Sequence, residues 1–153
     1  MRFTPHRYQE HALKWLIDLT LTKNVGAALF LDPGLGKTAV TLSWIKLLIR
    51  LGFAKRILVI APLRVVYSVW PAERSKWDQF KGLRTSIVHG TPMQRERALR
   101  NDAHIYLINP EGLPWLEQQL KDRLGYFQAL VVDESSKFKN WSAKRTRSLR
   151  RML

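Results

Sequence analysis

The stretch Leu31-Asp32-Pro33-Gly34-Leu35-Gly36-Lys37-Thr38 decides the fold of this 153-residue chain. It follows a continuous apolar run, residues 26–31, which is typical of a strand buried on both faces. It precedes a helical pattern over residues 38–51 that ends at Gly52. The glycines and the helix N-terminus let backbone N–H groups approach phosphate oxygens closely. The stretch therefore predicts a phosphate-binding loop.

Two side chains of this loop are suited to bind phosphate and a metal ion. Lys37 supplies a point charge for the β- and γ-phosphates, and the Thr38 hydroxyl is suited to hold Mg²⁺. The strict pattern G-x-x-x-x-G-K-[ST] has glycine where this chain has Leu31, so the match to the general motif is incomplete. The alternative interpretation is a glycine-rich turn with a solvent-exposed lysine.

An acidic pair, Asp133-Glu134, follows the apolar residues 130–132. An aspartate at the end of a strand can bind Mg²⁺ directly or through water. The adjacent glutamate points the other way along the pleat and can polarise an attacking water. The alternative is an ordinary acidic turn after a strand. Together with the lysine loop, the pair predicts a metal and nucleotide site.

Strand and helix patterns alternate along the chain. The predicted strands cover residues 26–31, 56–60, 84–88, 103–108 and 127–132. Four predicted helices cover residues 4–19, 38–51, 92–100 and 110–120. A further predicted helix runs through Trp70, Pro71, Ala72 and Trp77, and its regular part begins at Pro71. This order predicts one α/β domain over residues 1–153, with a parallel sheet and helices on both faces. Ligands of such sheets bind beyond the carboxyl ends of the strands, where both motifs lie.

The composition narrows the class of protein further. Hydrophobic residues make up 46% of the chain, which allows a packed core, and the formal net charge is +14, which favours nucleic acid as a partner. The absence of cysteine excludes disulfides, thiolate zinc sites and cysteine nucleophiles. The apolar stretches are too short to cross a bilayer and the first residues do not read as a secretion signal, so we expect a soluble intracellular domain.

Further segments resemble motifs of a known family. They are Arg7-Tyr8-Gln9 with Trp15-Leu16, the loop at 31–38, Ala61-Pro62-Leu63-Arg64, Asn109-Pro110-Glu111-Gly112-Leu113, and Asp133-Glu134-Ser135-Ser136 with Lys137, Lys139 and Asn140. In this order they resemble the adenine-reading segment and motifs I, Ia, Ib and II of superfamily 2 helicases. The chain is similar to the first RecA-like half of Swi/Snf-type DNA translocases and their phage-encoded relatives.

The resemblance implies a P-loop, RecA-like fold with ATP and Mg²⁺ as cofactors. Gln9, beside Arg7, would read the adenine edge, and Pro33, Gly34, Leu35 and Gly36 would form the loop around Lys37 and Thr38. Asp133 would complete the metal site and Glu134 would position water. It also implies action on DNA in the cytoplasm of a bacterium or a phage-infected host, or at the nucleoid.

The resemblance implies contacts with the backbone of duplex DNA. We expect them from basic residues near motifs Ia and II: Arg64, Lys137, Lys139, Lys144 and Arg145. After Glu134 the chain carries basic but no acidic residues, with Phe138 and Trp141 between them. The alternative for this segment is a solvated basic helix that packs inside the full-length family members.

The second RecA-like half, which supplies the arginine fingers in the family, has no counterpart in these 153 residues. Because an arginine finger is worth roughly 10³–10⁵ in rate, we expect the chain alone to bind ATP-Mg²⁺ and to hydrolyse it slowly or not at all. A second RecA-like domain or a helicase is then an expected partner. The rival hypothesis is a non-catalytic nucleic-acid-binding or regulatory protein derived from a helicase domain.

Overall fold

The computed structural model describes residues 2, 27–31, 37–123 and 125–133, and for residues 27–31 and 37 it describes the backbone. The strands are β1 (Ala27–Leu31), β2 (Ile57–Ile60), β3 (Thr85–Val88), β4 (Ile105–Ile108) and β5 (Ala129–Asp133). The helices are α2 (Lys37–Arg50), α3 (Leu63–Lys76), α4 (Pro92–Arg100) and α5 (Leu113–Leu120), with short 3₁₀ turns at Asp78–Phe80 and Pro110–Gly112. The helix predicted over residues 4–19 lies outside the described residues.

The five strands form one sheet in the order β1-β5-β2-β4-β3, and every pairing between neighbours is parallel. The prediction of a parallel α/β sheet is therefore confirmed. The order of the strands in space differs from their order in the sequence, because β5, the last described strand, lies between β1 and β2. This insertion brings the ends of β1 and β5 side by side.

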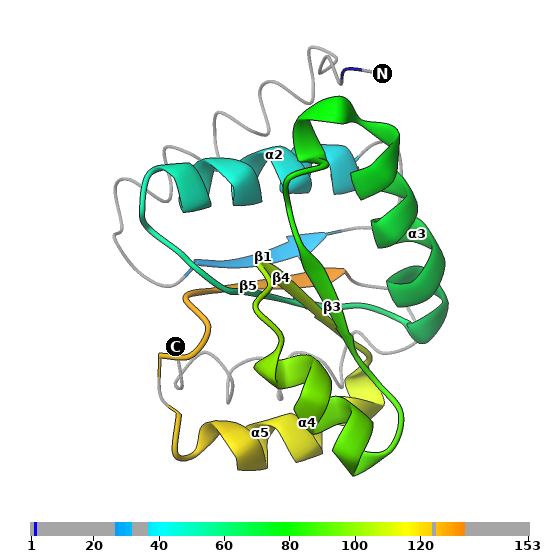
Figure 1. Cartoon of the computed structure of the whole chain (residues 1–153), viewed down its shortest axis with the longest axis vertical. Coiled ribbons are helices and arrows are strands. Elements are labelled where there is room, and N and C mark those ends of the chain that lie inside the picture. The colour runs from blue at the N-terminus through cyan, green and yellow to red at the C-terminus, as the bar shows by residue number, and fades with distance from the viewer. Residues whose placement is uncertain (1, 3–26, 32–36, 124, 134–153) are drawn as a thin grey trace.

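The two faces of the sheet are covered by different pairs of helices, with α2 and α3 on one side and α4 and α5 on the other (Figure 1). Successive side chains of a strand point to opposite faces. In β5, Ala129 and Val131 accordingly pack with α2 and α3, whereas Leu130 and Val132 pack with α4 and α5. By the same alternation, Asp133 belongs to the α2–α3 face.

Two helix ends have clear local causes. Gly52 has a φ of 78°, and the N–H groups of Gly52 and Phe53 donate to the carbonyls of Ile49 (3.2 Å) and Leu48 (2.9 Å), which is a Schellman end for α2. α4 begins with a capping box between Thr91 and Gln94. Both ends lie where the sequence predicts them.

One predicted helix start is wrong. α3 begins at Leu63, eight residues before Pro71, and Pro71 lies inside the helix. A proline removes one helical hydrogen bond, but Val66 and Trp70 lie one turn apart on the buried face of α3, and their burial holds the helix across the proline.

Two other boundaries shift by smaller amounts. The helix predicted from Pro110 starts as a 3₁₀ turn, and its α-helical part, α5, has Pro114 in the first turn, where proline is tolerated. β5 extends to include Asp133. Within the described residues, no helix is both long and apolar enough to cross a membrane.

Candidate functional site

The sheet brings the ends of the two motif-bearing strands together. Leu31, the last residue of β1, is paired in register with Asp133, the last residue of β5. The five residues 32–36 then connect β1 to Lys37, the first residue of α2. The segment predicted to bind phosphate and the acidic motif therefore follow neighbouring strands, at the same carboxyl edge of the sheet.

Asp133 is buried, with 9% of its surface exposed. The indole Nε1–H of Trp70, on α3, donates a hydrogen bond to its Oδ2 atom at a distance of 3.2 Å. Burial raises the pKa of the Asp133 carboxyl above its ordinary value, and the hydrogen bond from Trp70 opposes that rise. No basic side chain in the described part of the chain forms an ion pair with Asp133.

These residues fit a hard divalent cation. The Asp133 carboxylate and the Thr38 hydroxyl both offer oxygen ligands. Thr38 is the second residue of α2, which follows β1, and β1 is paired with β5, which ends at Asp133. The described residues contain no group of three or more acidic, histidine or cysteine side chains able to hold a metal ion by themselves. A site with few protein ligands is the usual arrangement for Mg²⁺ that also contacts phosphates.

Several predicted site residues lie outside the described part of the chain. They are Arg7, Gln9, Pro33, Gly34, Leu35, Gly36, Glu134, Lys137, Lys139, Lys144 and Arg145. Arg64 is described: it is exposed in the first turn of α3, which follows β2. Because β2 is the other neighbour of β5, Arg64 belongs to the same edge of the sheet as Asp133.

Asn109 adds a buried polar group to this edge. It directly follows β4, is 8% exposed, and its Nδ2 atom donates to Glu111 Oε2 at 2.8 Å. Its Oδ1 atom has no hydrogen-bond partner among the described residues. The sequence places Asn109 in the segment resembling motif Ib, but nothing in the sequence indicates that its side chain is buried.

His89 and His104, which lie next to strand ends, each contact a described neighbour. The Nδ1 atom of His89 lies 2.9 Å from the Tyr67 hydroxyl. His104 Nδ1 accepts the backbone N–H of Arg84 at 3.0 Å. Burial, and then the charge of Arg84, lower the pKa of His104 below its ordinary value.

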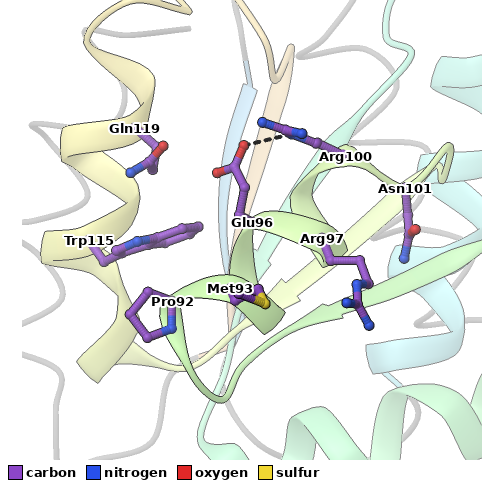
Figure 2. Close-up of a pocket in the computed structure, with 8 residues that line it drawn as sticks. All are labelled: Pro92, Met93, Glu96, Arg97, Arg100, Asn101, Trp115 and Gln119. Carbon is purple, nitrogen blue, oxygen red and sulfur yellow. Dashed lines mark hydrogen bonds and ion pairs between the residues drawn. The ribbon is translucent and has the colours of Figure 1, made fainter.

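A pocket lies on the other face of the sheet, between α4 and α5. Figure 2 shows its lining residues: Pro92, Met93, Glu96, Arg97, Arg100, Asn101, Trp115 and Gln119. Glu96 accepts a hydrogen bond from Arg100 Nε at 2.9 Å and lies 3.2 Å from Arg123. The charge of Glu96 is therefore paired with two arginines, and the sequence motifs do not include this pocket.

The fold and the paired strand ends define an α/β domain of the P-loop class. Comparison with known proteins gives the family: the SNF2-related domain matches residues 8–153, and the chain belongs to that family. It corresponds to the first RecA-like half of an SNF2-type superfamily 2 helicase.

The relatives agree with this assignment. The chain is 35% identical over 153 residues to putative protein p41 of Acyrthosiphon pisum secondary endosymbiont phage 1, covering 96% of this chain and 32% of p41. It is 29% identical over 154 residues to human lymphoid-specific helicase, covering 94% of this chain and 18% of the helicase. It thus spans a third or less of these relatives.

A solved structure is similar over nearly the whole chain. The Sulfolobus solfataricus SWI2/SNF2 ATPase core in complex with dsDNA superposes with a TM-score of 0.71 and 26% identity, covering 97% of this chain and 30% of that one. The RecA-like fold predicted from the sequence is confirmed by this similarity.

Proposed function

We propose that the chain is the nucleotide-binding domain of a DNA-dependent ATPase and holds ATP with Mg²⁺ at the carboxyl edge between β1 and β5. The observation that supports this proposal is the register pairing of Leu31 with Asp133. The pairing places the start of the segment 32–36 on the strand next to the one that ends at Asp133. The Asp133 carboxylate is buried and has no described cationic partner. A bound cation would compensate that carboxylate.

In this proposal each motif residue has one task. The backbone of residues 33–36 and the Lys37 ammonium bind the phosphates, while the Thr38 hydroxyl and Asp133 hold the metal ion. Mg²⁺, when bound, neutralises charge on the phosphates. Glu134 orients the attacking water, and Gln9 with Arg7 binds the adenine end.

Hydrolysis at a useful rate needs groups beyond these 153 residues. The described arginines lie in segments that correspond to the first RecA-like half, and phosphoryl transfer depends strongly on an arginine that contacts the developing charge. We therefore propose that the chain alone binds Mg²⁺-ATP with little hydrolysis, and that a second RecA-like domain completes the cleft.

Nucleotide binding is tested by replacing the loop lysine. At an ATP concentration about 100 times the Kd, Mg²⁺-ATP should stabilise the wild type by about 2.7 kcal/mol, which is roughly 5–10 °C in Tm for a chain of this size. Lys37→Ala should remove most of that shift. Lys55→Ala, which removes an exposed lysine just before β2, is the matched control and should keep it. Equal shifts in all three proteins would refute the proposal.

We also propose that the domain contacts the phosphate backbone of duplex DNA. The similar Sulfolobus structure is a complex with dsDNA, the chain carries a formal charge of +14, and Arg64 is exposed at the carboxyl edge beside the candidate nucleotide site. Lys137, Lys139, Lys144 and Arg145 would extend this contact. Phosphate contacts fix a protein on DNA without reading its sequence.

The DNA proposal predicts a salt dependence. Each phosphate contact contributes about −0.9 to the slope of log K against log salt for B-DNA, so Arg64→Ala should reduce that slope by about one. Arg50→Ala, at the exposed end of α2, is the control and should leave the slope unchanged. Filter binding or anisotropy across a salt series measures both. A strong preference for one DNA sequence at fixed salt would instead indicate base readout.

A further inference from the structure

We propose that Trp70 is the positioning residue of the nucleotide site: its indole N–H fixes the Asp133 carboxylate through which the domain would hold the metal ion of Mg²⁺-ATP. This inference rests on the proposed function. It assigns a task to a residue that belongs to none of the segments used to recognise the nucleotide site. Trp70 would act through Asp133 and would not itself contact the nucleotide.

The contact joins two elements that are distant in the sequence. Trp70 lies in the middle of α3 and Asp133 ends β5, and the bond from Nε1 to Oδ2 measures 3.2 Å. Trp70 is 1% exposed and Asp133 is 9% exposed, so little water competes for the bond. A hydrogen bond inside a protein is electrostatically stronger than one in water.

The indole is itself held firmly. Trp70 packs in the core between the sheet and the α2–α3 layer, with Val66 one turn earlier on the same face of α3. An indole nitrogen is a donor only and a carboxylate is an acceptor only, so this pair has a single possible direction. The packing of the ring therefore sets the orientation of the carboxylate.

The chemical nature of the donor matters. An arginine or lysine in this place would cancel the charge of Asp133 and compete with a metal ion. The indole is neutral, so it orients one carboxylate oxygen and leaves the charge and the remaining lone pairs available. Carboxylates that ligate metals are commonly held by such hydrogen bonds, and losing one typically costs 10–100-fold in metal affinity.

A purely structural role for Trp70 makes a different prediction. If the ring only fills the core, Trp70→Phe should lower stability and leave the dependence on Mg²⁺ unchanged. Trp77→Phe is a matched control. Trp77 is the C-cap residue of the same helix, α3, and its Nε1–H donates to Glu73 Oε2 at 2.8 Å instead of to Asp133. Both variants lose one indole hydrogen bond.

The test is a titration of MgCl₂ at fixed ATP, followed by thermal shift. Trp70→Phe should need about tenfold more Mg²⁺ for half of the ATP-dependent shift, and its affinity for ATP without Mg²⁺ should match that of the wild type. Trp77→Phe should behave as the wild type does. A folded Trp70→Phe protein with the wild-type Mg²⁺ requirement would overturn the inference.

A spectroscopic measurement does not require the Trp70 variant to fold. The Trp70 indole ¹H–¹⁵N resonance, assigned in the wild type, should shift in Asp133→Asn and on addition of MgCl₂ with ATP. A resonance that stays in place in both cases would also overturn the inference. The two proposals fail separately: a wild type that shows no Mg²⁺-dependent response to ATP refutes the proposed function, whereas a response that is indifferent to Trp70 refutes this inference alone.

Discussion

Two acidic side chains on opposite faces of the sheet have opposite surroundings. Asp133, on the α2–α3 side, is buried, and its described hydrogen-bond partner is the neutral indole of Trp70. Burial raises the pKa of Asp133, and the hydrogen bond from Trp70 only opposes that rise. Glu96, on α4, is bonded by Arg100 and Arg123. Partial burial alone would raise the pKa of Glu96, but the hydrogen bonds from the two arginines outweigh it and the pKa is lowered.

The difference separates a candidate ligand site from a structural contact. The charge of Glu96 is already compensated by Arg100 and Arg123, so Glu96 attracts a further cation only weakly. The charge of Asp133 is oriented but not compensated within the described residues, which suits it to a cation that arrives with a ligand. A pocket lies beside Glu96 (Figure 2), yet the chemistry favours the carboxyl edge as the ligand site.

The comparison predicts stability changes of opposite sign without ligand. Asp133→Asn replaces a buried charge, which no described side chain compensates, with a neutral amide of the same shape, so the unliganded variant should be more stable than the wild type. Glu96→Gln removes a partner from two surface arginines and should cost roughly 1 kcal/mol or less. Urea unfolding at neutral pH measures both, and we expect Asp133→Asn to give the larger change. Destabilisation by both substitutions would break the comparison.

A smaller effect is expected at the opposite edge of the sheet. His104, just before β4, has a lowered pKa and accepts the backbone N–H of Arg84 in its neutral form, with Asp102 nearby as the opposing charge. The unfolded chain therefore binds the proton more readily, so stability should fall as the pH drops below about 6.5. His104→Gln should flatten this slope in urea titrations between about pH 7.5 and pH 5. An unchanged slope would contradict the assignment.

Local rules predicted the elements well. The alternation of apolar runs and helical patterns gave the strands, the end of α2 at Gly52 and the bounds of α4, because buried strands, Schellman ends and capping boxes each have a short sequence signature. The start of α3 was missed for the opposite reason. A rule about Pro71 that holds for an isolated helix was overridden by burial of Val66 and Trp70.

The site was predictable in its position but not in its detail. A general property of parallel sheets places loop motifs at the carboxyl edge, and this accounts for the nearness of Asp133 to the loop that follows β1. The insertion of β5 between β1 and β2 depends on crossovers that no local pattern encodes. The bond between Trp70 and Asp133 depends on how α3 packs across the sheet, which no local sequence pattern specifies.

The central claim is that the loop following β1 and the Asp133 carboxylate serve one Mg²⁺-ATP. The most direct test measures ATP affinity with and without Mg²⁺ in the wild type, Lys37→Ala and Asp133→Asn. We predict that Lys37→Ala loses affinity under both conditions, and that Asp133→Asn keeps the Mg²⁺-free affinity but loses the gain that Mg²⁺ gives the wild type. An Asp133→Asn protein that retains the full gain from Mg²⁺ would contradict the account.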